Sequence, residues 1–412
     1  MSQWSPEWRV EIDGVEVTDS ILVDLTFTSG RNSIYEQAQA GYANVSLLNV
    51  GDVVQAFEIY QTIAIEIKDS TGTFIPIFGG YITDIMREIT STGEIQFAEV
   101  IRFIALGALH RLQRTTTEGV LSKDEDGDQI YEILKEVLFS QWQSVAPALT
   151  WATYDPAQTW AGAENAGLGE IDRPGDYELT ARSASTTIIY DLVADLATSG
   201  LGYLYEDAQG RISYADSTHR AQYLSTNGYI DLDATQALGV GIRTTTRAGD
   251  VRNRVIITYK NAAQVTAEDT ASQATFGVLA QNIGTSIENT SDAQDQADFY
   301  LELRAYPQPN FDSITFQLAN PDIDDADRDA LLNVSMGSAL NITNLPQSMG
   351  SAFQGFVEGW QMRAGIKSLA VTLRLSPIAY SLQAFRWNSV PASETWNTLS
   401  ATLTWEEATI VA

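Results

Sequence analysis

The stretches Phe78-Gly-Gly-Tyr-Ile-Thr-Asp-Ile85 and Phe353-Gln-Gly-Phe-Val-Glu-Gly-Trp360 align with each other. In each, an aromatic residue and a glycine two positions later open a run rich in β-branched and aromatic residues, which is typical of a strand. Each also follows an earlier predicted strand at a similar interval, 16 residues from Thr62 and 15 residues from Ser338. The shared order of features predicts an internal duplication of a β domain.

Further segments on both sides of these stretches carry the signals of antiparallel strands, with turn residues between them. In the N-terminal region they are Trp8–Asp13, Ala43–Leu48, Thr62–Ile67 and Ile95–Phe103. In the C-terminal region they are Asn253–Tyr259, Ser313–Leu318, Ala339–Ile342 and Leu369–Leu375, interrupted by one helix from about Asp292 to Ala305. These patterns predict two tube-like β-barrel domains, at residues 1–112 and 241–378.

Residues 113–240 differ from both flanking regions because helical and strand patterns are mixed there. Apolar residues recur at helical spacing in Asp128–Phe139, and Ser185–Ser199 is typical of a capped helix that ends at Gly200. The segment Gly202–Ala215 predicts a hairpin that turns near Gln209-Gly210. The chain is therefore expected to be mainly β with an α+β insertion domain at 113–240.

The last residues, 379–412, carry three tryptophans spaced nine residues apart, Trp387, Trp396 and Trp405. Nine residues place successive side chains on opposite faces of either a strand or a helix, so one regular element does not explain the spacing. Tryptophan is concentrated at interfaces. We expect an extended arm whose tryptophans dock on a neighbouring chain. A second set with the same spacing, Trp142, Trp151 and Trp160, is expected to pack within the insertion domain.

Composition narrows the classes of function. The chain has 412 residues and a formal net charge of −29, so specific binding to nucleic acid is not expected. It contains no Cys and only His110 and His219, which leaves no residues for a Cys-based metal site or a thiol nucleophile. Neither a signal peptide nor a membrane-spanning run is apparent. No cofactor and no catalytic residues are expected.

Two acidic clusters invite a metal-site interpretation. Asp124–Asp128 resembles the start of a calcium loop, but Gln129 and Lys135 stand where such a loop needs Gly and Glu. A polar loop that begins a helix is the favoured interpretation. The cluster Asp322–Asp329 is likewise expected to begin a helix near the positive end of its dipole, with a metal site or a solvent loop as the alternatives. The two histidines are expected to be structural or surface residues.

Several of these segments, in this order, resemble minor tail proteins of long-tailed phages, especially those that infect actinobacteria. The matching segments are Gly41–Asn49, Gly202–Tyr214, Arg254–Tyr259, Phe353–Trp360 and the tryptophan-containing arm. At Gly337-Ser-Ala-Leu340 the sequence departs from the charged Gly-Asp-Arg turn that the resemblance leads us to expect. The family is similar to baseplate hub proteins of tail tips.

The resemblance implies a structural virion protein at the tail tip, made in the cytoplasm of a bacterial host. It implies a homotrimer whose two barrels per chain form a pseudo-sixfold ring around the DNA exit path. The implied partners are a distal tail or tail tube protein, the tape measure protein, and tail fibre or receptor-binding proteins. An acidic lumen is a further expectation, because like charge would let DNA slide. A carbohydrate-binding host-recognition protein and a tail-associated cell-wall hydrolase are the alternatives.

Overall fold

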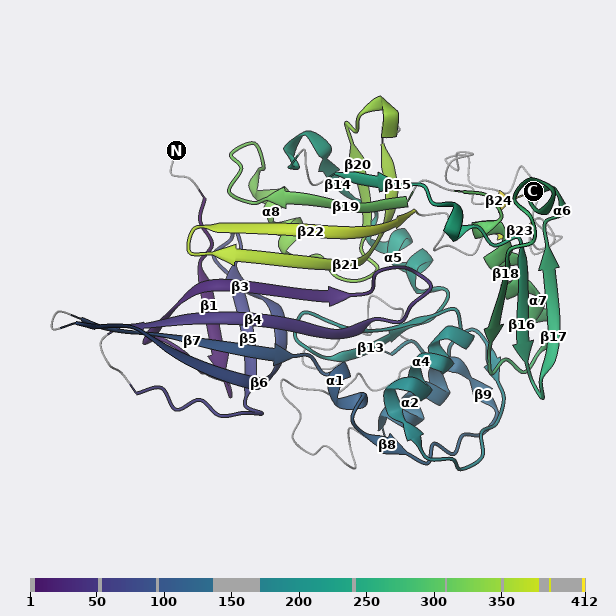
Figure 1. Cartoon of the computed structure of the whole chain (residues 1–412), viewed down its shortest axis with the longest axis horizontal. Helices are drawn as coiled ribbons and strands as arrows, with labels where there is room; N and C mark the ends of the chain where they lie inside the picture. The colour runs from purple at the N-terminus through teal and green to yellow at the C-terminus, as the bar shows by residue number, and fades with distance from the viewer. Residues whose placement is uncertain are drawn as a thin grey trace.

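A computed structural model describes residues 4–50, 54–93, 96–135, 171–238, 242–307, 310–349, 352–377, 385–386 and 410–411. Its main body is a sheet of 13 strands, with helical segments and smaller sheets at one end (Figure 1). Both sets of tryptophans, 142–160 and 387–405, lie outside the described residues. The mainly β character expected from the sequence is confirmed.

The N-terminal region contributes seven strands to the main sheet. In sheet order they are β3 (Ser20–Gly30), β4 (Gln39–Val50), β7 (Gln96–Leu106), β6 (Phe74–Gly93), β5 (Thr62–Lys68), β1 (Trp8–Ile12) and β2 (Val15–Glu16). Apolar side chains alternate along these strands, so that one face is buried. On β3, for example, Leu25 and Phe27 are fully buried, whereas Asp24 is exposed.

The C-terminal region contributes the other six strands, and their order matches that of the first region. They are β15 (Arg243–Thr245), β19 (Asn310–Gln317), β22 (Ser368–Pro377), β21 (Phe353–Gly365), β20 (Ala339–Thr343) and β14 (Ile230–Asp233). Reading both series in sheet order pairs β3 with β15, β4 with β19, β7 with β22, β6 with β21, β5 with β20 and β1 with β14. One difference is that β14 runs parallel to β20, whereas β1 runs antiparallel to β5.

The two aligned stretches occupy corresponding places in these two series. Phe78 lies opposite Ile65 on β5, and Phe353 lies opposite Ile342 on β20. The ladder to the next strand shifts register between positions 82 and 84 on β6 and between positions 357 and 359 on β21. With residue 78 aligned to residue 353, these two irregularities fall at the same aligned position. The alignment therefore holds residue by residue across this part of both regions.

The two regions form one sheet because β21 pairs with β3 as well as with β20 and β22. The strands of the described residues follow an open path that ends at β15 on one side and at β2 on the other. Two separate closed barrels, as expected from the sequence, are thus not confirmed. Alternation of apolar residues identifies a strand and its buried face, but it does not identify the neighbouring strand.

The insertion combines short strands with helices that pack at one end of the sheet (Figure 1). Its elements in chain order are α1 (Leu109–Leu112), β8 (Thr116–Thr117), β9 (Asp124–Glu125), α2 (Asp126–Lys135), β10 (Glu178–Leu179), β11 (Thr187–Ile188), α4 (Ile189–Ser199), β12 (Tyr203–Glu206), β13 (Ile212–Ala215) and α5 (His219–Asn227). The predicted hairpin is confirmed as β12 and β13. The predicted helix ends at Gly200 but begins at Ile189, because Thr187 and Ile188 pair with β8.

A second group of elements lies between β15 and β19. It comprises β16 (Arg254–Tyr259), β17 (Ala263–Glu268), α6 (Thr270–Phe276), β18 (Ala280–Gly284) and α7 (Thr290–Arg304). The helix expected near 292–305 is confirmed as α7. The strand expected at 253–259 exists, but it is the centre of a separate three-stranded sheet instead of part of the main one. Its alternating burial looks the same in any half-buried strand, so the sequence pattern did not distinguish the two sheets.

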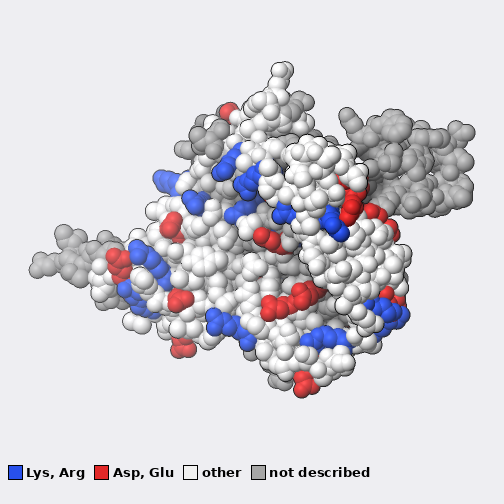
Figure 2. Space-filling view, turned by 45° about the vertical axis from the view of Figure 1, so that its right-hand side comes forward, with Lys and Arg blue, Asp and Glu red and all other residues white. Residues whose placement is uncertain are grey.

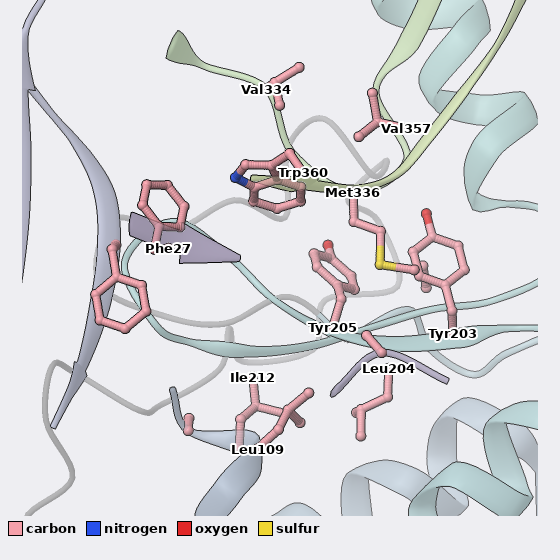
Figure 3. Close-up of a cluster of buried hydrophobic side chains, with 14 of the residues drawn as sticks. Phe27, Leu109, Tyr203, Leu204, Tyr205, Ile212, Val334, Met336, Val357 and Trp360 are labelled. Carbon is pink, nitrogen blue, oxygen red and sulfur yellow. The ribbon is translucent and has the colours of Figure 1, made fainter. Parts of the chain in front are cut away.

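The insertion is joined to the main sheet through the β12–β13 hairpin. Figure 3 shows Met336 between the rings of Tyr203 and Tyr205 on one side of this hairpin, and Leu204 and Ile212 on the other side with Leu109 of α1. All of these side chains are buried and belong to one continuous core. The remaining elements are α8 (Asp325–Leu332), the short helical turns Ala234–Gln236, Ala248–Asp250 and Gln347–Met349, and the pair β23 (Phe385–Arg386) and β24 (Ile410–Val411).

Candidate assembly interface

The junction between the two β regions is an antiparallel ladder of seven residue pairs from Gly359↔Gly30 to Gly365↔Asp24. At its first pair the backbones come unusually close. A Cβ atom on Gly30 would lie 2.3 Å from the carbonyl oxygen of Glu358, and Gly30 also has a φ of +87°. Only glycine accepts both conditions without strain. The sequence is thus adapted locally to this strand-to-strand contact.

A buried cluster of charges lies directly beside the same pair. The Glu358 carboxylate on β21 accepts a hydrogen bond from Arg31 Nε at 2.6 Å and from Arg220 Nη1 of α5 at 2.7 Å. Ser376 Oγ on β22 donates to it at 2.5 Å. The Arg31, Arg220 and Glu358 side chains are each at most 5% exposed. The cluster joins the end of β3, the insertion and the second β region at one point.

Aromatic rings complete the surroundings of this cluster. The guanidinium carbons of Arg31 and Arg220 lie 5.1 and 4.7 Å from the ring centroid of Tyr203, within the range of cation–π attraction. Burial opposes ionisation of Glu358, but the positive charges of Arg220 and Arg31 outweigh it and lower the pKa of Glu358 to about 2. Glu358 is therefore ionised at neutral pH. The two arginines and the Ser376 hydroxyl compensate for the desolvation of its carboxylate.

A second buried carboxylate fastens the insertion to the first β region. Glu206 at the end of β12 accepts hydrogen bonds from the backbone N–H of Gly41 on β4, at 2.8 Å, and of Leu109 on α1. Burial raises the pKa of Glu206 to about 7 despite these two bonds. A Cβ atom on Gly107 would collide with this carboxylate, so the site also depends on that glycine.

Two strands of the main sheet have an unpaired edge among the described residues: β6 beyond Ile82, and β15. Beyond Ile82, β6 pairs only with β7 among the described strands, because β5 pairs with residues 74–81 alone. On this part of β6, Met86 and Ile89 are 58% and 59% exposed. At the other end, β15 pairs only with β19 among the described strands. Unpaired strand edges are templates for pairing with another chain.

The solvent face of the sheet carries both signs of charge. By strand alternation, this face includes the acidic and basic residues Asp24, Asp84, Glu88, Arg102, Arg363 and Arg374. Figure 2 shows Lys and Arg interspersed with Asp and Glu over one side of the molecule, with Lys and Arg predominating along its upper part. The large negative charge of the chain is therefore not concentrated on this side.

The first acidic cluster has a structural role. Asp126 is fully buried, accepts hydrogen bonds from the backbone N–H of Asp176 and Tyr177 at 2.8 Å, and also accepts one from the Tyr214 hydroxyl. Burial raises the pKa of Asp126 to about 7. Asp128 pairs with Arg173 at 2.6 Å. These contacts agree with the favoured interpretation of this cluster as the start of a helix.

The second acidic cluster begins α8, as expected. The Asp324 side chain caps the helix by accepting a hydrogen bond from the backbone N–H of Asp327 at 2.8 Å. Asp329 accepts a hydrogen bond from the backbone N–H of Ser70 at 3.0 Å, which ties α8 to the β5–β6 turn. Within the described ranges, no group of three or more His, Asp or Glu side chains could hold a metal ion.

The histidines lie apart from each other in structural settings. His219 on α5 is buried, and its Nδ1 lies 2.7 Å from the Asp172 carboxylate. Asp172 is 47 residues away in the sequence, which is why the sequence pattern did not reveal this partner. His110 is partly buried and lies beside Tyr81. No helix among the described residues is long and apolar enough to cross a membrane.

Comparison with solved structures places this architecture among tail proteins. The 43 kDa tail protein of prophage MuSo2 from Shewanella oneidensis matches with a TM-score of 0.57 and 11% identity, over 92% of this chain and 99% of that chain. The tail protein from Neisseria meningitidis MC58 matches with a TM-score of 0.58 and 10% identity, over the same shares. No family model matches the sequence, and a search of curated proteins found no match. This chain has the fold of these two tail proteins.

Proposed function

We propose that this chain is a structural subunit of a phage tail or a related injection device, positioned at the tail tip as a baseplate hub. The observation that carries the proposal is a sheet made of two series of strands in the same order, joined by β21 and β3 and open at β6 and β15. The shared fold with two tail proteins, over nearly their full lengths, supports the same assignment.

In the proposed assembly, three copies form a closed ring. The two strand series within one chain are the product of an internal duplication, so a trimer presents six similar units. Such a ring has threefold symmetry and approximates sixfold symmetry, which suits docking onto a hexameric tail tube. A distal tail or tail tube protein binds on one side of the ring, and the tape measure protein and fibre or receptor-binding proteins bind elsewhere on it.

The ring surrounds the DNA exit path and opens by a conformational change, with no bond chemistry. The solvent face of the sheet carries both acidic and basic side chains. It is therefore not a uniformly acidic surface that would repel DNA. Hydroxyl and amide side chains on this face, such as Thr26, Thr28, Asn44, Gln361 and Thr372, present no positive charge to phosphates. The basic residues of the same face, Arg102, Arg363 and Arg374, are interspersed with the acids Asp24, Asp84 and Glu88, so DNA would release fewer counterions there than on a uniformly basic surface.

Gold-labelled antibodies against this chain, applied to intact particles and viewed by electron microscopy, test the location. The proposal predicts label at the tail end distal to the head. Label on the head or along the whole tail, or particles that lack the chain, would contradict it. The antibody should be tested in parallel on particles assembled without the chain, where labelling must disappear.

A zymogram on host cell wall separates this proposal from a tail-associated hydrolase. We expect no clearing by the purified chain under conditions in which lysozyme clears the gel. Clearing that persists after repurification would replace the structural proposal with an enzymatic one. Binding to a glycan array that is lost in Trp396→Ala would instead favour the carbohydrate-binding alternative.

A further inference from the structure

We infer that β6 of one copy pairs with β15 of a second copy in a defined antiparallel register, with Glu88 opposite Arg243 and Asp84 opposite Arg247. This inference rests on the proposed ring and specifies its interface. The template is the β21–β3 junction within the chain, where the corresponding strands already pair. The two exposed edges, β6 beyond Ile82 and β15, are the counterparts of β21 and β3.

The register follows from two rows of residues that run across the sheet. In the first region one row passes through Asp84, Ile104, Asn44 and Thr26. The corresponding row in the second region passes through Gly359, Arg374, Ser313 and Arg243. The step from Arg374 to Ser313 continues the β19–β22 ladder by one residue beyond its last pair, Ile314 and Leu373. Arg243 is therefore the counterpart of Thr26. Since Thr26 lies opposite Arg363, and Arg363 corresponds to Glu88, Arg243 is expected opposite Glu88.

The charges at these positions are complementary between the two edges. Counting along the same register places Asp84 opposite Arg247, the counterparts of Gly359 and Gly30. All four side chains belong to exposed residues. Each pairing joins an acid on β6 to an arginine near β15, and opposite charges directly across a ladder stabilise the pair. A shift of the register by one residue would break both matches and would place side chains that point to opposite faces of the sheet across from each other.

An apolar pairing in the same register accounts for one exposed side chain. Ile89 is 59% exposed on β6, and the register places it opposite Ile242, which is half-buried. The corresponding residues of the internal junction, Ala364 and Leu25, are buried at 4% and 0% exposure. Ile89 lies on the core side of the sheet, as does its counterpart Ala364, which β3 already covers. Pairing with a second copy would cover Ile89 in the same way.

Cysteine cross-linking of the full chain tests the register without background, because the natural sequence has no Cys. The variant Met86→Cys/Thr245→Cys places two thiols directly opposite each other, and oxidation should link copies into covalent multimers on a non-reducing gel. Thr28→Cys/Gln361→Cys is the matched control, because these counterparts are paired within the chain and should form an intramolecular disulfide. Met86→Cys/Arg243→Cys is displaced by two residues and should link poorly.

Charge reversal provides a second test that does not depend on thiol geometry. Glu88→Arg alone and Arg243→Glu alone should each weaken self-association by about fivefold, and the double variant should recover it. The unfolding midpoint of each variant, measured in parallel, must remain that of the natural chain. Failure of the double variant to recover association would overturn the Glu88–Arg243 pairing.

The outcomes distinguish this inference from the proposed ring. Suppose that the natural chain forms multimers and the internal control forms its disulfide. If the displaced pair Met86→Cys/Arg243→Cys then cross-links, or if neither intermolecular pair does, the register is overturned and the ring is not. A natural chain that remains monomeric at all concentrations tested and also forms no ring in intact particles would overturn the ring, and the register with it. Multimers linked through Met86→Cys/Thr245→Cys support both.

Discussion

The carboxylate of Glu358 lies 2.6 Å from Nε of Arg31, a residue 327 positions earlier in the chain. This contact crosses the junction at which β21 joins β3, so a buried charge pair reinforces the backbone ladder between the two regions. Arg220 of the insertion binds the same carboxylate at 2.7 Å. The three parts of the chain therefore meet at one carboxylate.

Glu358→Gln should lower the free energy of unfolding by about 3–5 kcal/mol, because two buried guanidinium groups lose their counter-charge. Urea denaturation followed by tryptophan fluorescence measures this loss. The control is Glu7→Gln, which removes the exposed partner of Lys68 and should cost less than about 1 kcal/mol. Equal effects of the two substitutions would show that the buried cluster is not a special source of stability.

The pH dependence of stability should carry opposite contributions from two buried glutamates. The pKa of Glu358 is lowered to about 2, so its contribution is present above the pKa of the unfolded chain and is lost as pH falls toward 2. The pKa of Glu206 is raised to about 7, so its contribution is present below the pKa of the unfolded chain and is lost as pH rises through about 7.

Glu206→Gln should therefore flatten the decline in unfolding free energy between about pH 5 and pH 7. The measurement is a series of urea unfolding curves at half-unit pH steps for both proteins. Glutamine can accept only one of the two backbone hydrogen bonds that Glu206 accepts, and this loss does not vary with pH. Comparing how the free energy of unfolding changes with pH, instead of its absolute value, removes that constant difference. Parallel curves for the variant and the natural chain would contradict the assignment of this titration to Glu206.

Two glycines at aligned positions should be equally intolerant of a side chain. A Cβ atom on Gly80 would lie 2.5 Å from the carbonyl oxygen of Leu106, and one on Gly355 would lie 2.2 Å from that of Ser376. Gly80→Ala and Gly355→Ala should each cost about 1–3 kcal/mol in thermal or urea unfolding, because the backbone must move. Gly249→Ala, where nothing lies within 4 Å, is the control and should be nearly neutral.

Removal of the C-terminal arm should impair assembly more than folding. Truncation after Leu382 deletes Trp387, Trp396 and Trp405, which we propose as anchors on a neighbouring chain. The truncated chain should keep its unfolding midpoint and form fewer multimers by analytical ultracentrifugation. A full-length variant with all three tryptophans replaced by alanine should behave in the same way. Assembly of either variant at normal yield would show that the arm is not an interface.

The sequence predicted local elements better than it predicted how they combine. The β12–β13 hairpin, the end of α4 before Gly200, and the start of α8 within the cluster Asp322–Asp329 follow from turn and capping residues that act within a few positions. The alignment of Phe78 with Phe353 predicted the corresponding places of β6 and β21. The β21–β3 junction could not be predicted, because pairing between residues more than 300 positions apart leaves no periodic signal in either strand.

The charge cluster was also beyond the reach of sequence patterns, although one signal was present. Glu358 is a lone acid within the apolar run Phe353–Trp360, and a buried acid of this kind requires a partner. The sequence does not tell which of 24 Lys and Arg residues supplies it. Arg31 and Arg220 come from a strand end and a helix that meet β21 only in the folded chain.

The mass of the purified assembly tests the central claim most directly. Native mass spectrometry of the full chain, alone and as released from intact particles, measures it. The account predicts a closed species of three times the 45.1 kDa chain. A strict monomer in solution that also forms no ring in intact particles would contradict the account.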